Sequence, residues 1–137
     1  MNKTELFASA IVLMSEDINK TIDFYKNQLG FEVIKNFEHE EKFAACYRDN
    51  VEIVVVQIKK GKVISNTKRY GAGFDAYLVP EDVNAFYNEI KDKEVKIIEK
   101  PVLKSYGSIE MKIEDIDGRI IGIGRVEDQE VFFNKNN

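Results

Sequence analysis

The pattern of apolar and polar residues is clearest at residues 17–31, DINKTIDFYKNQLGF. Four apolar side chains there share one face of a helix, at spacings of i, i+4, i+7 and i+11: Ile18, Ile22, Tyr25 and Leu29. Asp17 can cap the N-terminus by accepting backbone N–H bonds, and Gly30 can end the helix in the left-handed conformation. The apolar runs at 8–14 and 31–37 predict a strand on each side of this helix.

The same order of elements returns 65 residues further along the chain. Asp82 then falls on Asp17, residues 73–79 fall on the first strand, and an apolar stripe predicts a helix over 83–90. Further strands are predicted at 41–49, 51–59, 95–101, 108–115 and 118–125, with hairpin turns at Asp49-Asn50 and Asp117-Gly118. Each half therefore reads βαβββ, which predicts an α+β fold with eight strands and two principal helices. One such unit cannot bury its apolar face alone, so the two halves are expected to pair.

Length and composition indicate a single globular domain of 137 residues, 44% hydrophobic and 32% charged. Module one is expected over about 5–60, a linker over 61–71, module two over 72–126 and a tail over 127–137. A net charge of −4 argues against a nucleic-acid partner, which would favour a basic surface. The apolar run at 8–14 is too short to span a membrane, so no membrane association is expected. The single cysteine, Cys46, permits no internal disulfide and favours a cytoplasmic location.

Three segments together resemble the vicinal oxygen chelate superfamily, which includes glyoxalase I, bleomycin-resistance proteins and extradiol dioxygenases. They are DINKTIDFYKNQLGFEV in the first half, and VPEDVNAFYNEI and DIDGRIIGI in the second, where Ile116 replaces the proline of the family's Asp-Pro-Asp-Gly turn. The resemblance covers the whole chain except the tail. It implies two βαβββ modules forming a cup-shaped, eight-stranded mixed sheet with helices outside, a small-molecule ligand inside, and usually a homodimer.

Metal-dependent members of that superfamily hold an ion with four side chains from the first and last strands of each module. Carried over by the resemblance, those positions fall on Ala10, Val54, Asp75 and Gly122. Three of these side chains have no atom that can bind a metal, and one carboxylate cannot replace the lost hydration shell of a divalent ion. The expectation is a protein with neither metal nor other cofactor.

Alternation along the strands predicts what lines the cup, because side chains two residues apart share a face. The lining is largely apolar, which favours a ligand that is apolar or aromatic, with Asp75 and Tyr77 as polar contacts. Alternatively, these side chains fill the cup as core. Gly122 and Gly124 either clear space for a ligand or mark a bulge. The predicted ligand-binding residues are Val12, Met14, Val54, Asp75, Tyr77, Tyr106, Ile120 and Gly122.

Three functions are compatible with these features. The favoured one is a metal-free binding protein that sequesters a small apolar or aromatic compound, such as an antibiotic. The second is a glyoxalase-like lyase, isomerase or dioxygenase, with Asp75 as general base or with displaced metal ligands from His39, Glu52 or Glu110. The third is a dimeric interaction module whose cup is filled. A one-residue slip in strand register would exchange the two faces of a strand and change the candidate residues.

Four other features carry weaker signals. His39, the only histidine, is flanked by Glu38, Glu40 and Glu41, which indicates an exposed turn residue unless it reaches the cup rim. The basic linker 59–69 reads as a solvated hinge or as an anion-attracting rim. Cys46, within an apolar strand, is expected to be buried and inert. Phe132 and Phe133 in the tail are expected to pack against the domain or a partner subunit.

Overall fold

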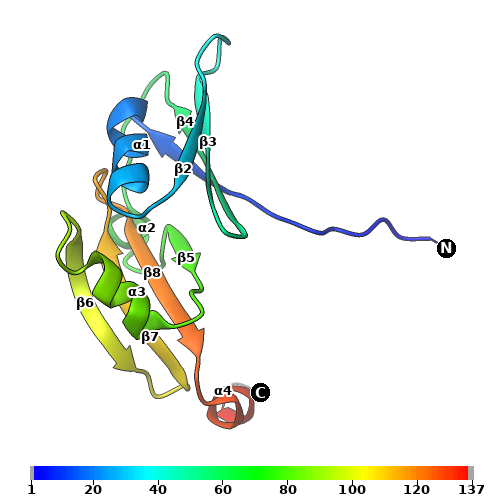
Figure 1. The fold of residues 1–137 in the computed structure, drawn as a ribbon, viewed down its shortest axis with the longest axis vertical. Coiled ribbons are helices and arrows are strands. Elements are labelled where there is room, and N and C mark those ends of the chain that lie inside the picture. The colour runs from blue at the N-terminus through cyan, green and yellow to red at the C-terminus, as the bar shows by residue number, and fades with distance from the viewer. Residues whose placement is uncertain (1, 136–137) are drawn as a thin grey trace. The chain divides into compact units, whose positions relative to one another are not determined.

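The computed structural model describes residues 2–135, and it divides into two compact units between Lys62 and Val63 (Figure 1). We call them module one and module two and describe each by itself. Each contains one four-stranded mixed sheet, so the eight predicted strands are hydrogen-bonded as two sheets. The predicted α+β fold with two βαβββ modules is confirmed.

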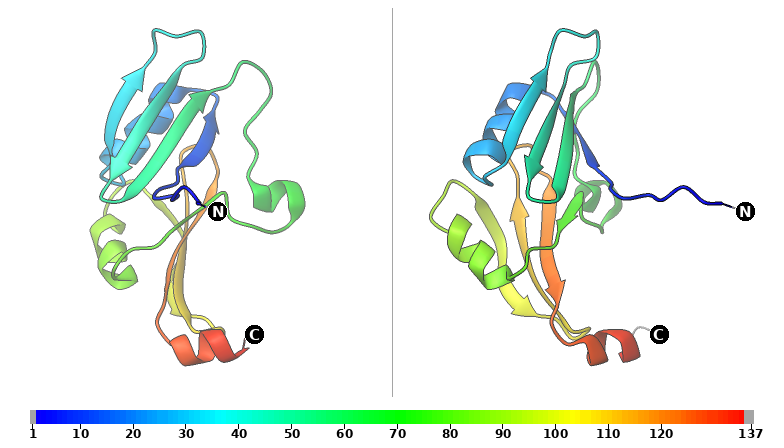
Figure 2. Two further views of the ribbon diagram at one scale, coloured as in Figure 1. Left: turned by 90° about the vertical axis from the view of Figure 1, so that its right-hand side faces the viewer. Right: turned by 45° about the vertical axis from the view of Figure 1, so that its right-hand side comes forward.

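Module one contains the first helix and four strands. They are β1 (Ile11–Ser15), α1 (Ile18–Asn27), β2 (Glu32–Asn36), β3 (Phe43–Arg48) and β4 (Val51–Gln57). The strand order is β1-β4-β3-β2; β1 runs parallel to β4 and the other neighbours are antiparallel. Helix α1 lies against one face of this sheet, behind the strands in the left view of Figure 2. Among the described residues of module one, no helix lies on the other face of the sheet.

Module two repeats this arrangement and adds two short helices. Its elements are α2 (Asn66–Tyr70), β5 (Ala76–Leu78), α3 (Val83–Ile90), β6 (Lys96–Leu103), β7 (Ser108–Glu114), β8 (Ile120–Val126) and α4 (Gln129–Lys135). The strand order is β5-β8-β7-β6, again with one parallel pair, β5 and β8. Pro101 is tolerated in β6 because β6 is an edge strand whose register shifts between Glu99 and Val102.

The faces of both sheets follow the predicted alternation. Side chains on the faces contacted by α1 and α3 are buried, including Leu13, Ile53, Val55, Ala76, Leu78, Ile121 and Ile123. The register places Val12 beside Val54 in module one and Tyr77 beside Gly122 in module two. The strands therefore have the predicted register, without a one-residue slip. We call the sheet face that lacks the long helix of its own module the open face.

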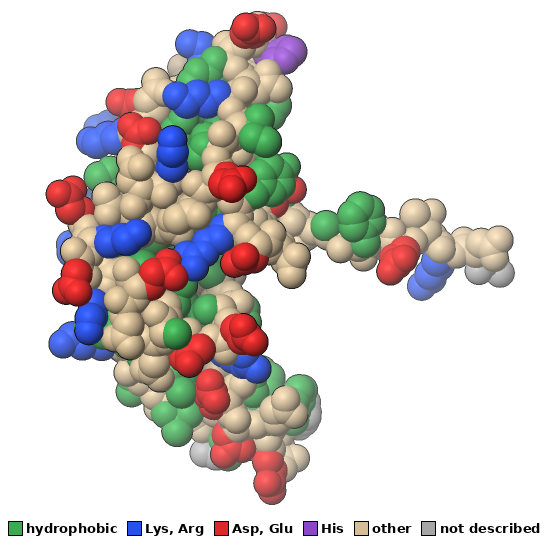
Figure 3. All heavy atoms as spheres, in the orientation of Figure 1, with side chains coloured by type: hydrophobic (Ala, Val, Ile, Leu, Met, Phe, Trp, Pro, Cys, Tyr) green, Lys and Arg blue, Asp and Glu red, His purple; other side chains and the backbone are tan. Residues whose placement is uncertain are grey.

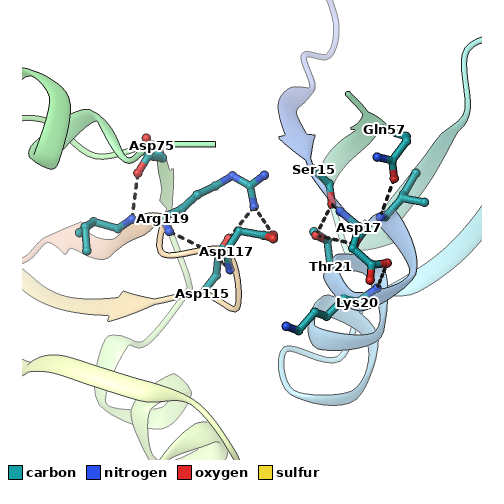
Figure 4. A network of polar contacts seen from close by, with 11 residues as sticks. Ser15, Asp17, Lys20, Thr21, Gln57, Asp75, Asp115, Asp117 and Arg119 are labelled. Carbon is teal, nitrogen blue, oxygen red and sulfur yellow. Dashed lines mark hydrogen bonds and ion pairs between the residues drawn. The ribbon is translucent and has the colours of Figure 1, made fainter. Parts of the chain in front are cut away.

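The start of α1 shows why this helix begins where the sequence predicts. Asp17 accepts a hydrogen bond from the backbone N–H of Lys20, and Gln57 on β4 accepts one from the N–H of Ile18 at 2.9 Å (Figure 4). The buried hydroxyls of Ser15 and Thr21 lie 2.6 Å apart. The bonds from Ile18 and Lys20 satisfy two of the N–H groups that the first turn of a helix leaves without partners. Together with the Ser15–Thr21 contact, they also join the helix to the ends of β1 and β4.

Four details differ from the sequence prediction. Strand β1 begins at Ile11, and residues 2–10 form an extended, exposed arm; in Figure 3 its side chains stand apart from the rest of module one. Strand β5 has only three residues. Helix α2 forms within the linker, and α4 forms within the tail. None of the helices among residues 2–135 has the length and apolar character needed to cross a membrane.

Candidate functional site

The open face of module one is largely apolar. Val12 and Met14 on β1 are 56% and 42% exposed. Their register neighbours continue the surface across β4 and β3: Val54 and Ala45 in one row, and Val56 and Phe43 in the next. Large apolar side chains left in contact with water on a sheet face commonly mark a binding surface. This surface contains three of the predicted ligand-binding residues.

The open face of module two is polar, and Glu110 lies at its centre. Glu110 on β7 is only 6% exposed. One of its carboxylate oxygens accepts a hydrogen bond from the Tyr77 hydroxyl at 2.9 Å, and the other accepts one from the Tyr106 hydroxyl at 2.8 Å. Tyr77 comes from β5, and Tyr106 comes from the turn before β7. One buried carboxylate thus holds two tyrosines that lie 29 residues apart in the sequence, at positions 77 and 106.

Gly122 and Gly124 on β8 allow the Tyr77 ring to cross that strand. A Cβ at Gly122 would lie 2.7 Å from Cδ2 of Tyr77 and 3.0 Å from the Phe74 ring. A Cβ at Gly124 would overlap the Tyr77 hydroxyl and lie 2.7 Å from Cγ of Glu110. The register between β7 and β8 is continuous, so the glycines do not mark a bulge. They make room for two aromatic rings, and the space above them is already occupied.

Both tyrosines remain protonated far into the alkaline range. Burial, followed by the hydrogen bond to Glu110 and its negative charge, raises the pKa of Tyr106 from 10.0 to about 12. The same causes, in the same order, raise the pKa of Tyr77. A neutral phenol donates its proton, and an ionised carboxylate can only accept. The two hydroxyl protons are therefore directed at Glu110.

Other charges on this face are arranged around the tyrosines. Lys104 Nζ lies 2.6 Å from Glu99 Oε1, and this pair is the main reason that the pKa of Glu99 is lowered. Lys112 Nζ lies 5.8 Å from the centroid of the Phe74 ring, within the range of a cation–π contact. The Phe74 and Tyr77 ring centroids are 5.5 Å apart. We call the rings of Phe74, Tyr77 and Tyr106 the aromatic surface. Charged groups of both signs border it.

Asp75 has a structural role that the sequence did not indicate. Its carboxylate accepts hydrogen bonds from the backbone N–H of Asn66 and of Ile120, both at 2.9 Å, and Figure 4 shows the second of these. It thereby joins α2 to the start of β8. Both oxygens are engaged with backbone donors, an arrangement typical of a carboxylate that fixes a loop.

The turn before β8 is fixed by a buried ion pair. Arg119 is 3% exposed, and its Nη1 lies 2.9 Å from Asp115 Oδ2 and 2.8 Å from Asp117 Oδ2 (Figure 4). Asp115 also accepts backbone N–H bonds from Asp117 and Arg119. This is the DIDG segment that contributed to the family resemblance, and Gly118 takes a positive φ of 84° there.

The residues present do not fit the superfamily's metal site. Ala10, Val54 and Gly122 offer no donor atom, and both oxygens of Asp75 are bonded to backbone amides. Within residues 2–135, no three or more His, Cys, Asp or Glu side chains form a group that could hold a metal ion. We therefore derive no chemistry from a metal at these positions.

The structure distributes the predicted site residues over the two open faces. Val12, Met14 and Val54 are on the face of module one. Tyr77, Tyr106 and Gly122 are brought together around Glu110, with Asp75 and Ile120 at the neighbouring end of β5 and β8. Sequence analysis named Glu110 only as an alternative metal ligand and missed Phe74 and Lys112. Polar residues alternate with apolar ones in SIEMKIE of β7, and this pattern would have placed Glu110 and Lys112 on one face.

Four further candidates lie outside these faces or carry no reactive group. His39 is exposed in the turn between β2 and β3. Cys46 is fully buried in β3, as predicted, and burial raises the pKa of its thiol to about 11. The linker contains α2, in which no residue is buried. In the tail, Phe132 approaches the turn at Gly107, while Phe133 is 54% exposed.

Two βαβββ modules with parallel first and last strands define the glyoxalase-type class of α+β proteins. The chain belongs to the glyoxalase-like domain family, whose family profile matches residues 8–127. A comparison with curated proteins found no match.

Solved structures share the fold at low sequence identity. SMU.1112c is 23% identical, with a TM-score of 0.70 over 90% of this chain and 100% of that one. A member of the glyoxalase/bleomycin resistance protein/dioxygenase superfamily from Sphaerobacter thermophilus DSM 20745 is 18% identical, with a TM-score of 0.67 over 88% and 97%. TioX from Micromonospora sp. ML1 is 16% identical, with a TM-score of 0.65 over 87% and 99%. At these identities the similarity establishes the fold alone.

Proposed function

We propose that this protein binds a small, largely apolar or aromatic molecule, without a metal, and sequesters it rather than converting it. The observation that carries this proposal is the open face of module one, where Val12 and Met14 remain 56% and 42% exposed beside other apolar side chains. Burying a side chain of this size stabilises a complex by roughly 1.5–3 kcal/mol. An antibiotic is one such ligand, as the resemblance to bleomycin-resistance proteins implies.

The open face of module two supports binding rather than catalysis. A general base needs a free lone pair within reach of the proton it removes. The oxygens of Asp75 accept backbone N–H bonds, and those of Glu110 accept two tyrosine hydroxyls. Asp75 and Glu110 thus already act as hydrogen-bond acceptors within the fold, which favours a structural role for both carboxylates. Asp75 and Ile120 were both predicted to bind the ligand. We propose that they lie beside the aromatic surface and do not react.

A neutral dye tests the proposal. Titration with N-phenylnaphthylamine, followed by fluorescence, is expected to show saturable binding to the wild-type chain. Val12→Lys and Met14→Lys place a charge on the apolar face, so each is expected to weaken binding about tenfold or more. Both side chains are exposed, so the variants should fold. Ile116→Lys, at an exposed position in the turn before β8, is the matched control and should bind as the wild type does.

Two results would contradict the proposal. The first is the absence of saturable binding by any neutral or charged aromatic compound. The second is a stoichiometric transition metal in protein purified without chelator and measured by elemental analysis. That result would favour the alternative of a lyase, isomerase or dioxygenase with displaced ligands.

A further inference from the structure

The two open faces differ in chemistry although the modules share one fold. The register aligns Val12 with Tyr77, Val54 with Gly122 and Phe43 with Glu110, because these residues occupy matching positions in the two sheets. Module one therefore presents apolar side chains where module two presents a tyrosine and a buried carboxylate. Module two is the part of the fold that can distinguish polar groups on a ligand.

Glu110 determines which hydrogen bonds the two tyrosines can still make. A tyrosine hydroxyl has one proton to donate and lone pairs that accept. Tyr77 and Tyr106 each donate that proton to an oxygen of Glu110, at 2.9 and 2.8 Å. Their hydroxyl oxygens can then act only as acceptors toward anything else. Donation to an anion also makes each phenol richer in electrons, which strengthens its attraction for a positive charge.

The tyrosines remain accessible although the carboxylate is not. Tyr77 is 38% exposed, and Tyr106 is half-buried, while Glu110 is 6% exposed beneath them. A ligand on this face therefore meets phenol oxygens and aromatic rings rather than the carboxylate itself. The Phe74 ring extends this surface beside Tyr77.

We propose that the open face of module two selects an aromatic ligand that carries hydrogen-bond donors, above all a protonated amine or amidine, through the acceptor-only hydroxyls of Tyr77 and Tyr106. Glu110 is a positioning residue in this site: it orients both phenols and fixes their donor direction. The inference rests on the proposed function and specifies the chemical class of its ligand. An anionic aromatic compound of the same size would meet these acceptors and electron-rich rings, and is expected to bind less tightly even though Lys112 lies over the neighbouring Phe74 ring.

Three aromatic probes of similar size separate the contribution of charge and hydrogen bonding from that of the ring. They are benzamidine, which is a cationic donor, benzoate, which is an anionic acceptor, and neutral ethylbenzene. Calorimetric titration of the full chain is expected to show benzamidine bound at least about tenfold more tightly than benzoate, since hydrogen bonds that involve charged groups contribute this much or more. Ethylbenzene should fall between the two. Benzoate binding as tightly as benzamidine would overturn the inference.

The Glu110→Gln variant tests the role of the carboxylate. A glutamine amide donates to one tyrosine, whose hydroxyl proton then points elsewhere, so one of the two acceptor-only oxygens is lost. We expect benzamidine affinity to fall about tenfold while ethylbenzene affinity stays within about twofold. Glu40→Gln is the control, because it makes the same chemical change at an exposed carboxylate in the turn between β2 and β3, where Glu40 Oε1 lies 3.9 Å from Lys59 Nζ. An equal effect of both variants, or no effect of Glu110→Gln, would contradict the inference.

The Tyr106→Phe variant tests whether loss of folding, rather than loss of an acceptor, explains the effect of Glu110→Gln. This variant keeps the ring and removes one acceptor, and circular dichroism should show an unchanged fold. Its preference for benzamidine over benzoate should fall. An unchanged preference would contradict the inference. If ethylbenzene and the neutral dye bind but benzamidine has no advantage, this inference fails and the proposed function stands. If none of these compounds binds, both fail.

Discussion

Tyr77 crosses its neighbouring strand only because that strand carries glycine at two positions on one face. Gly122 lies beneath the ring, and Gly124 lies beneath the hydroxyl that reaches Glu110. Glycine within a strand lowers its stability, because it has more backbone freedom to lose and no side chain to pack. Here that loss is offset by a buried hydrogen bond and by two packed aromatic rings. The glycine pair is therefore part of the candidate site rather than of the sheet alone.

The Gly124→Ala variant tests this coupling. The new Cβ would overlap the Tyr77 hydroxyl and crowd Glu110, so Tyr77 must move and its bond to Glu110 is lost. We expect the free energy of unfolding to fall by about 1–3 kcal/mol, the usual cost of overpacking, as measured by urea denaturation. In a Tyr77→Ala background the same change should cost much less, because its main obstacle is gone. An equal cost in both backgrounds would show that Tyr77 is not the cause.

At the scale of single residues, the sequence predicts which face of a strand a side chain occupies better than it predicts which groups that side chain bonds to. Period-two alternation placed Val12, Val54, Tyr77 and Gly122 on the correct faces, because that period is a property of each strand alone. The bonds of Glu110 depend on where the turn before β7 puts Tyr106 and on how far the Tyr77 ring extends. The two backbone bonds of Asp75 likewise depend on α2, which lacks an apolar stripe and was read as part of a hinge.

The two long helices both begin with an aspartate N-cap. Asp17 accepts the N–H of Lys20 at the start of α1, and Asp82 accepts the N–H of Ala85 at 3.0 Å at the start of α3. Each helix follows a short strand in its module, so the cap fixes where the chain turns from strand to helix. Helix α1 has further support from Gln57, whose side-chain nitrogen donates to the carbonyl of Glu16 at 2.8 Å.

Replacing the caps should therefore destabilise the two modules to similar extents. Asp17→Ala and Asp82→Ala are each expected to lower the free energy of unfolding by about 1 kcal/mol, because each removes an acceptor from the first turn of a helix. Asp17→Asn and Asp82→Asn are the controls; asparagine caps helices as well as aspartate, so their unfolding curves should match the wild type. Destabilisation by the asparagine variants as large as that by alanine would show that charge, not the cap, is responsible.

Caps and stripes explain why α1 and α3 were predicted and α2 and α4 were not. The long helices bury an apolar stripe, and its period is visible in the sequence. Helix α2 buries no residue, and its only signals are the cap at Ser65 and Gly71 with a φ of 76°. Helix α4 begins after Asp128, whose side chain accepts the N–H of Val131 at 3.0 Å. Signals of this kind also mark isolated turns, so they did not identify helices by themselves.

At the scale of the whole molecule, the N-terminal arm is the feature that a single chain leaves without an explanation. The arm is residues 2–10, and within it Leu6 and Phe7 are 94% and 92% exposed. The chain leaves the sheet before Ile11, although the apolar run at 8–14 predicted a strand from residue 8. Strand β1 is an edge strand of its sheet, so one side of its backbone has no partner strand among the described residues of module one, and edges of this kind commonly pair with a second chain.

We therefore predict a homodimer in which the arm of each chain packs on the other. Burying a leucine and a phenylalanine from each arm would contribute several kcal/mol to association, at roughly 1.5–3 kcal/mol for each side chain. Sedimentation velocity is expected to give a dimer for the wild type and a shift toward monomer for the Leu6→Ser/Phe7→Ser double variant. Leu103→Ser, at a residue 60% exposed on β6, is the control and should leave the dimer intact. Because both arm side chains are exposed within their own chain, the double variant should keep the wild-type circular dichroism spectrum. A monomeric wild type, or a double variant that dimerises as well as the wild type, would show that the arm does not hold two chains together.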